Sequence, residues 1–394
     1  GGVYAFDMPE AMLALYANGR VLGDVFETRQ GMATTDNGRF VRFWWEVSQR
    51  DIGRHHNQAN ASNPPWVPYN KGGTPVRWWG NQEHVVRWLD DARELREIGA
   101  KSLNQPRFFD SSVSWSNIGK GGARFRLYPP GFVFDVAGMS AFAPDEESQL
   151  NLLGYLNADV VTQALDVLAP TLNYQVGDVA RLPVPDMTHA ADADRVRELI
   201  ALARANWAEQ ETSHEFTGSP LLAFRDLPLE SAVAQYLGQF RVRRDRIAAL
   251  ERESGDYWSS VISVVTGVAC PIPRVPDSLP KPTEQEVLED YVSYTVGCMF
   301  GRYDPEQQGP HLANAGESAL PAGADADNVI PIVAEDWFED DIEQRFRDIL
   351  RSQFGEEHFA RNVQYVIETL GVASLKSYFL KIFYRQHWQR YKKR

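Results

Sequence analysis

The chain has 394 residues, of which 43% are hydrophobic, and its formal net charge is −13. This length favours two or three domains over a single core, and the hydrophobic fraction excludes a disordered chain. No apolar run approaches the roughly 20 residues that a membrane span needs, and no signal peptide is visible. The two cysteines, Cys270 and Cys298, give no disulfide framework. We therefore expect a globular cytoplasmic protein that does not contact a membrane.

The negative charge is distributed unevenly along the chain. Residues 1–130 contain 16 Lys and Arg against 13 Asp and Glu, whereas residues 131–394 contain 24 against 40. The stretch 29–126 contains 15 against 9, so the first third is mildly basic and the remainder is acidic. A modest basic face suits a module that recognises a nucleic-acid duplex, although this charge alone does not establish one.

The first predicted element is a helix at residues 7–18, with Asp7 as its N-cap and Pro9 in its first turn. From residue 20 to about 187, short apolar runs separated by Gly, Pro, Asn and Ser predict strands. Two longer amphipathic stretches in this region predict helices. The predicted strands include 40–47 and 131–136, and the predicted helices are 83–98 and 150–168.

From residue 188 to the end, apolar residues recur with a period near 3.6, which predicts a mostly helical region. The predicted helices are 196–207, 229–250, 284–300, 337–352, 357–370 and 374–393. The proline-rich segment 269–282 predicts a linker or wrapping loop, and 304–328 predicts a long loop. The fold class is therefore α+β, with a mixed α/β domain at 20–187 and a mostly α-helical domain at 188–394.

A tetrapeptide in the first third has the letters of a catalytic motif. Asn63-Pro64-Pro65-Trp66 matches the Asn-Pro-Pro-aromatic signature of amino-methylating DNA methyltransferases, whose aromatic residue stacks on a flipped base. However, no glycine-rich methyl-donor loop precedes position 63, and no apolar strand leads into the tetrapeptide. We therefore interpret it as a proline-stiffened loop without a catalytic role.

A series of polar and aromatic motifs runs along the chain. They are Gly31–Phe40, Trp44–Glu46, Pro68–Gly73, Trp78–Asn81, Trp115–Ser116, Gly131–Gly138, Leu153–Asn157, Pro170–Asp178, Gly297–Tyr303, Asn328–Ile332, Phe338–Asp341 and Tyr378–Lys381. In this order they resemble the region downstream of the catalytic domain in the large adenine-N6 DNA methyltransferases of phage growth limitation and BREX defence systems (PglX-type). The resemblance covers nearly the whole chain.

This resemblance implies a function for each part of the chain. Residues 1–19 would link to a methyltransferase domain absent from the chain, residues 20–187 would be the DNA target recognition domain, and residues 188–394 a helical spacer and scaffold. It implies a full-length, S-adenosylmethionine-dependent adenine-N6 methyltransferase, of which this chain alone is not catalytic and holds no cofactor or metal. The implied partners are double-stranded DNA, the methyltransferase domain and other proteins of the defence system.

Target recognition requires side chains for phosphates and side chains for base edges. Arg and Lys suit phosphates, while Arg reads guanine, and Asn or Gln reads adenine. The predicted phosphate contacts are Arg39, Arg42, Arg50, Arg54, Lys71, Arg77, Lys120, Arg124 and Arg126. The predicted base-reading residues are Asn57, Asn60, Asn70, Asn81, Asn173 and Gln175. The glycine pairs at 72–73 and 121–122 would let the backbone approach the duplex, because glycine has no Cβ.

Structural alternatives exist for several of these residues. An arginine on a strand can be solvated or paired with an acid, and Asn70, Asn81 and Asn173 can close turns. We predict that Trp44, Trp45, Trp78, Trp79 and Trp115 are core residues rather than stacking platforms. His55–His56 lacks a second ligand pair and predicts a loop, whereas Glu339–Asp341 predicts the solvated first turn of a helix.

Two other function classes stay open. A protein-interaction scaffold could use the acidic helical half of the chain. A carbohydrate-binding protein could stack its 11 tryptophans on sugar rings, although the absence of an export signal and of disulfides weighs against it.

Overall fold

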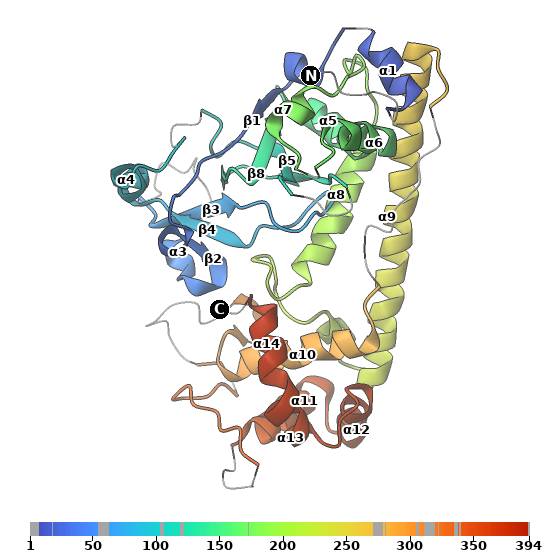
Figure 1. Cartoon of the computed structure of the whole chain (residues 1–394). Coiled ribbons are helices and arrows are strands. Elements are labelled where there is room, and N and C mark those ends of the chain that lie inside the picture. The colour runs from blue at the N-terminus through green and yellow to red at the C-terminus, as the bar shows by residue number, and fades with distance from the viewer. Residues whose placement is uncertain are drawn as a thin grey trace. The chain divides into compact units, whose positions relative to one another are not determined.

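The structure is a computed structural model of the chain. It describes residues 8–17, 19–53, 63–102, 106–118, 122–171, 173–270, 279, 281–304, 307–310, 320–321, 323–334, 338 and 340–392. The chain is α+β, as the sequence predicts. It divides into two compact units, whose elements Figure 1 labels. Unit 1 comprises Gly1–Ala205 and Asp245–Ser278, and unit 2 comprises Asn206–Arg244 and Leu279–Arg394.

Within the described residues, unit 1 contains two sheets of four strands each (Figure 1). The first sheet has the order β1-β8-β5-β6 with antiparallel neighbours, and the second has the order β2-β4-β3-β7, in which only β3 and β7 are parallel. The strands are β1 (Glu27–Arg29), β2 (Val41–Phe43), β3 (Trp66–Asn70), β4 (His84–Arg87), β5 (Ser112–Ser116), β6 (Phe125–Tyr128), β7 (Val133–Phe134) and β8 (Gly138–Phe142). Every residue of β5 and β8 is buried, so both faces of the first sheet are covered at its centre.

The predicted helix at 83–98 is wrong in its first half. Val85 and Val86 belong to β4, which pairs with β2 on one side and β3 on the other, and both side chains are buried. Their β-branched side chains favour a strand. Only the later part of the stretch is helical, in α4 (Leu89–Glu97), whose residues Asp90, Asp91 and Ala92 have positive φ.

Helices complete unit 1. They are α1 (Glu10–Tyr16), α2 (Leu22–Val25), α3 (Asn37–Phe40), α5 (Glu146–Asn157), α6 (Asp159–Leu168), α7 (Val176–Ala180), the first part of α8 (Ala193–Ala208) and the last part of α9 (Leu229–Thr266), with 3-10 turns η2 (Trp44–Glu46) and η3 (Gln49–Asp51). Helix α5 begins where the Asp145 side chain accepts a hydrogen bond from the Ser148 amide at 2.8 Å. The predicted helix at 150–168 is two helices, because the backbone of Ala158 is extended.

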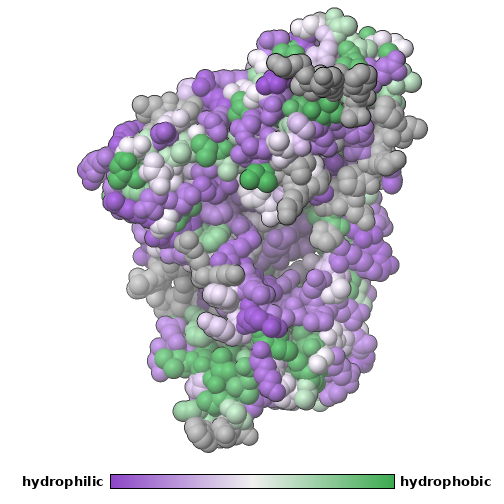
Figure 2. All heavy atoms as spheres, in the orientation of Figure 1, coloured by the Kyte–Doolittle hydropathy of each residue, from purple (hydrophilic) through white to green (hydrophobic). Residues whose placement is uncertain are grey.

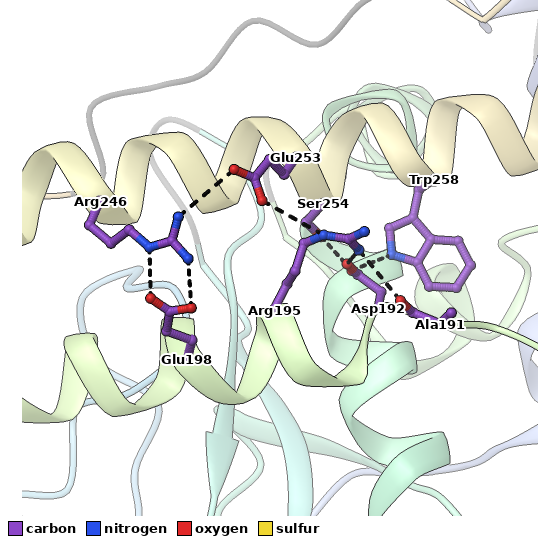
Figure 3. Close-up of polar contacts among 8 residues, drawn as sticks. All are labelled: Ala191, Asp192, Arg195, Glu198, Arg246, Glu253, Ser254 and Trp258. Atoms are coloured by element: carbon purple, nitrogen blue, oxygen red, sulfur yellow. Dashed lines mark hydrogen bonds and ion pairs between the residues drawn. The ribbon is translucent and has the colours of Figure 1, made fainter.

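A buried carboxylate joins α8 to α9 in unit 1 (Figure 3). Asp192, next to the start of α8, is fully buried. It accepts hydrogen bonds from Ser254 Oγ, from Trp258 Nε1 at 2.9 Å and from Arg195 Nη1 at 2.6 Å. Burial raises the pKa of the Asp192 carboxyl, against the opposing effect of these donors. This contact therefore ties the end of α9 to the sheet-bearing part of unit 1.

Unit 2 is mostly helical, and it falls within the stretch 188–394 for which the sequence predicts helices. It contains the first part of α9, the 3-10 turn η4 (Pro220–Phe224), α10 (Glu284–Met299), the hairpin β9 (Tyr303–Asp304) and β10 (Gln307–Pro310), α11 (Ile342–Phe354), α12 (Phe359–Thr369), α13 (Leu375–Tyr378), the π-helix η5 (Phe379–Phe383) and α14 (Tyr384–Arg390). Asp341 caps α11 by accepting a hydrogen bond from the Gln344 amide at 2.9 Å. The helix begins at Ile342 rather than at 337, and Asp341 is a buried N-cap, so the prediction of a solvated first turn is wrong for this residue. Glu339 lies outside the described residues.

Two further observations concern the described part of the chain. None of its helices is both long and apolar enough to cross a membrane. None of its His, Cys, Asp and Glu side chains gather in a group that could hold a metal ion. His55 and His56 lie outside the described residues.

Candidate nucleic-acid interface

The two polar stretches around residues 70 and 174 are connected through the end of β5. The Tyr174 amide donates to the Asn117 carbonyl at 2.8 Å, and the Asn117 amide donates to the Ala137 carbonyl at 3.0 Å. The Asn70 side chain then donates to the Gly138 carbonyl at 3.2 Å. Segments 70–73, 116–118, 135–138 and 173–175 therefore form one continuous region, which we call the motif edge.

Three amide side chains form a cluster on the motif edge. Gln175 Nε2 donates to Asn117 Oδ1 at 2.9 Å and to Asn173 Oδ1 at 2.8 Å. All three side chains are partly exposed. Among the described residues, Asn117 Nδ2, Asn173 Nδ2 and Gln175 Oε1 make no hydrogen bond to another side chain. This amide cluster is held in place by its own hydrogen bonds and still offers donors and an acceptor.

Lys71 lies next to Asp135 on the motif edge. Its Nζ is 2.6 Å from Asp135 Oδ2 and 3.2 Å from Asn37 Oδ1, and its side chain is 24% exposed. The Tyr69 hydroxyl donates to the same carboxylate oxygen, and burial raises the pKa of Tyr69 well above its ordinary value. Lys71 is therefore a partly accessible cation with one ammonium hydrogen beyond its two contacts.

Three predicted DNA contacts lie inside unit 1. Asn70 is 1% exposed and donates to Ser114 Oγ at 2.7 Å. Arg126 is fully buried, with Nη2 3.0 Å from the Gly72 carbonyl. The Arg77 side chain is 7% exposed and lies 3.6 Å from Asp159, in an ion pair. In this conformation these polar groups stabilise unit 1, and we leave them out of the candidate interface.

The remaining predicted cations differ in their surroundings. Arg39 is exposed, pairs with Glu94 at 3.1 Å and belongs to α3, the helix whose Asn37 contacts Lys71. Arg42 is partly buried, and its guanidinium donates to two backbone carbonyls of α3 and β2. Arg50 is exposed in η3. Arg39 is thereby linked to the motif edge through α3.

Two predicted residues occupy loops near β6 and β4. Arg124 is half-buried, and burial together with the charge of Arg77 lowers its pKa. Asn81 has a positive φ of 60° and donates to the Thr74 carbonyl, so it closes a turn. Four other predicted contacts, Arg54, Asn57, Asn60 and Lys120, lie outside the described residues.

The catalytic-looking tetrapeptide has a structural explanation. Asn63 Oδ1 accepts a hydrogen bond from the Asp90 amide at 2.8 Å, and Asn63 Nδ2 donates to the Asp90 carboxylate. Trp66 begins β3, and the Arg87 guanidinium lies 5.6 Å from the centre of its ring. Both ends of the tetrapeptide are thus engaged in local contacts that fix β3 against α4 and β4.

Asn117 is the member of the amide cluster that sequence analysis missed. It directly follows the Trp115–Ser116 motif and lies immediately after the end of β5. Trp115 is fully buried and donates from Nε1 to the Tyr174 carbonyl at 2.9 Å. An amide immediately after an apolar strand is the signal that could have identified it, since strand ends commonly carry binding residues.

A cleft of about 910 Å³ also opens in unit 1, but none of its lining residues belongs to the motif edge. Two of its aromatic walls are covered by arginines of the same chain. The Arg204 guanidinium lies 4.9 Å from the Trp79 ring centre, and that of Arg107 lies 5.6 Å from the Phe142 ring centre. We assign no ligand to this cleft.

Comparison with known proteins gives two relatives along almost the whole chain. The adenine-specific methyltransferase BrxX of Escherichia coli O9:H4 (strain HS) is 27% identical over 394 residues, which cover 90% of this chain and 32% of that protein. The adenine-specific methyltransferase PglX of Lacticaseibacillus casei (strain Zhang) is 27% identical over 407 residues, which cover 95% of this chain and 33% of that protein. The chain is related to the PglX-type methyltransferases.

The relationship predicted from the motifs is thereby confirmed. The chain spans about a third of the length of the curated relatives that it matches. No protein-family model matches the chain.

Proposed function

We propose that unit 1 recognises the DNA target of an adenine-specific methyltransferase in a BREX-like phage-defence system. The names of the two relatives support the reaction class. The amide cluster on the motif edge is the observation that carries the assignment to recognition. Its free amide groups come from two sequence segments that are far apart, and hydrogen bonds between them orient all three side chains.

The amide cluster has the chemistry for reading adenine. An Asn or Gln amide can donate to N7-side acceptors and accept from the N6 amine in a bidentate contact, which discriminates by about 1–3 kcal/mol. Asn173 and Gln175 are partly exposed and prearranged, so little side-chain entropy is lost when they bind. We assign bidentate base reading to Asn117 and Asn173, which keep their Nδ2 donors and one Oδ1 lone pair, whereas Gln175 gives both Nε2 hydrogens to the cluster and can only accept through Oε1.

Phosphate contacts would come from cations next to the motif edge. Lys71 can direct its remaining ammonium hydrogen at a phosphate while it stays paired with Asp135. Arg39 is 56% exposed and can exchange its contact with Glu94 for a phosphate, because exposed ion pairs stabilise a protein by only about 0–1 kcal/mol. In this proposal S-adenosylmethionine binds to a catalytic domain of the full-length enzyme, and no residue of this chain is catalytic.

A selection experiment tests this function without knowledge of the target sequence. The purified chain is incubated with a duplex library that contains a randomised central segment, and the bound fraction is sequenced. We expect enrichment of a short motif that includes adenine. The double variant Asn173→Ala with Gln175→Ala should lose this enrichment while general duplex binding remains. Equal enrichment by this variant, or none by the unsubstituted chain, would refute the proposal.

A matched control uses amides elsewhere on the chain. Gln285 and Gln364 are exposed side chains of unit 2, each hydrogen-bonded to a glutamate one helical turn away. The double variant Gln285→Ala with Gln364→Ala removes the same chemical groups and should leave the enriched motif unchanged. A change in the motif would show that amide loss acts through general effects on the protein.

A second candidate function is a protein-interaction scaffold, favoured by an apolar surface of unit 2. The exposed apolar residues of the segment before α11 are Leu320, Val329, Ile332 and Phe338. Figure 2 shows apolar side chains gathered over the part of unit 2 around α11 and α13. Substitution of Val329 and Phe338 by Asp should release a partner of the defence system that co-purifies with the chain. Carbohydrate binding has no such support: of the five tryptophans predicted to be core residues, Trp44, Trp78, Trp79 and Trp115 are buried, and Trp45 is partly buried against the core.

A further inference from the structure

The charge of the chain changes sign near its C-terminal end. Residues 131–394 contain 24 Lys and Arg against 40 Asp and Glu, yet no acid follows Glu368. The basic residues after this point are Lys376, Lys381, Arg385, Arg390, Lys392, Lys393 and Arg394. The consecutive helices α13, η5 and α14 therefore form a cationic element within an acidic unit.

One face of this element is anchored in unit 2. Tyr378, Phe379, Phe383 and Tyr391 are buried, and three of them belong to the core of unit 2. Arg390 is bound to Asp290 at 2.6 Å in an ion pair on this inner side. The cationic element is therefore held in place by the core of unit 2, and the charge of its inward-facing arginine is already compensated by an ion pair.

The opposite face combines apolar, aromatic and cationic side chains. Leu380 is 41% exposed, Tyr384 72% and Trp388 44%, and these residues follow one another at intervals of four. Lys381 and Arg385 are exposed directly beside them. In the described part of the chain, no ion pair or hydrogen bond is recorded for either cation. We call these five residues the outer face.

Two residues of the outer face, Leu380 and Lys381, belong to a π-helix. Phe379–Phe383 has π-helical hydrogen bonding between α13 and α14. π-helical turns are rare in proteins, and those that occur often lie at functional sites. A π turn takes more residues than an α turn, so side chains four residues apart fall nearly above one another. Leu380 and Tyr384, and likewise Lys381 and Arg385, are thereby brought into register along the helix axis.

We propose that the outer face binds the sugar–phosphate backbone of DNA beside the target site, without regard to sequence. This inference rests on the proposed function of unit 1. Residues four apart on a helix are separated by about 6 Å along its axis, so Lys381 and Arg385 can contact neighbouring phosphates of one strand. Tyr384 would pack against sugars of a duplex or against unstacked bases of a single strand.

Charge complementarity favours DNA over a membrane. An in-plane membrane helix needs a wide apolar face that can leave the protein. Here the large apolar residues Phe379 and Phe383 are turned inward and buried, and only a narrow apolar row remains outside. Lys381 and Arg385 lie beside this row, and basic groups next to aromatic side chains are the combination that tracks a nucleic-acid backbone.

The test compares DNA affinity across salt concentrations. Fluorescence anisotropy measures binding of a labelled random duplex, and of a single strand of the same length, by the whole chain and by Lys381→Glu with Arg385→Glu. We expect the double variant to bind about tenfold more weakly at low salt, and its slope of log affinity against log salt to fall by about 1.8 for a duplex, since each phosphate contact adds about 0.9. Tyr384→Ala should weaken single-strand binding at least about fivefold.

A matched variant controls for net charge. Arg225 and Arg241 are exposed arginines of unit 2 on other elements, so Arg225→Glu with Arg241→Glu changes the net charge equally. This control should retain DNA affinity within about twofold. Equal losses in the two double variants would overturn the proposal, because they would show a long-range charge effect. A circular dichroism spectrum unchanged by Lys381→Glu with Arg385→Glu establishes that α13 and α14 remain folded.

The outcomes separate this inference from the proposed function. If the unsubstituted chain selects a DNA motif and the outer-face variant binds equally well, the outer face does not contact DNA and only this inference fails. If the variant binds more weakly but selects the same motif, both proposals are supported. Absence of DNA binding by the unsubstituted chain overturns both. Co-sedimentation with anionic phosphatidylglycerol vesicles, lost in the variant while DNA binding persists, would replace DNA with a membrane surface.

Discussion

Replacement of Asp192 by Ala should destabilise unit 1 strongly, because it removes the carboxylate that accepts hydrogen bonds from Ser254 and Trp258 of α9. Trp258 is fully buried and Ser254 is 3% exposed, so neither donor can turn to water once the carboxylate is lost. Each buried donor left without a partner costs about 1–3 kcal/mol. Arg195 is 33% exposed and can be solvated, so the loss of its ion pair with Asp192 adds little to the cost. Removal of a buried charge offsets part of this cost, and we expect a net loss of about 2–4 kcal/mol.

Urea unfolding followed by tryptophan fluorescence and by far-ultraviolet circular dichroism measures this loss. Glu198→Ala is the matched control, because Glu198 lies on α8, which Asp192 precedes, and binds Arg246 of α9 at 2.7 and 2.8 Å (Figure 3). Both side chains of that pair are nearly half exposed, so its loss should cost less than about 1 kcal/mol. If the two variants lose equal stability, or if Asp192→Ala loses less than the control, the argument from burial is refuted.

Three further predictions concern the same unit. Since burial raises the pKa of Asp192 above its ordinary 3.8, the native state binds this proton more tightly than the unfolded chain, and the unfolding free energy relative to Asp192→Asn should fall as pH rises from about 4 through the raised value. Urea titrations across pH check this, and a difference that grows with pH would contradict it. Gly138→Ala would place a Cβ 2.4 Å from the Asn70 carbonyl oxygen, and it should cost about 1–3 kcal/mol in unfolding free energy and weaken motif selection; unchanged stability would show that the end of β3 can move. Arg126→Met should change the unfolding free energy by less than about 1.5 kcal/mol, because the guanidinium is buried with Nε and Nη1 lacking hydrogen-bond partners among the described residues. A stable Arg126→Met variant with weakened DNA binding would show that Arg126 belongs to the DNA interface after all.

The helices of unit 2 were predictable from sequence because each buries one stripe of a repeating pattern. Helices α11 and α12 each turn a regular apolar row into the core, and their predicted positions are confirmed to within a few residues. The helix predicted at 83–98 failed because Val85 and Val86 fit a helical stripe as well as a strand. Neighbouring strands on both sides decide this choice, and they come from distant sequence.

The candidate site was predictable by residue type but not by burial. The sequence singled out Lys71, Asn173 and Gln175, which the structure connects through the motif edge. It also singled out Asn70 at the end of β3 and Arg126 in β6, which are buried and donate hydrogen bonds to serine hydroxyls of β5. Alternation of polar and apolar residues identifies an exposed strand face, but it gives no such signal where both faces are buried.

The division of unit 1 into two separate stretches of sequence affects how the chain is made. Trp78 Nε1 donates to Glu251 of α9 at 2.7 Å, and Asp192 depends on Ser254 and Trp258 of the same helix. A nascent polypeptide that has left the ribosome only as far as Ala205 lacks all three of these partners. The part of unit 1 that is synthesised first therefore cannot complete its packing until Asn206–Arg244 and the rest of α9 have emerged. Any truncated version intended for expression would need α9 for the same reason.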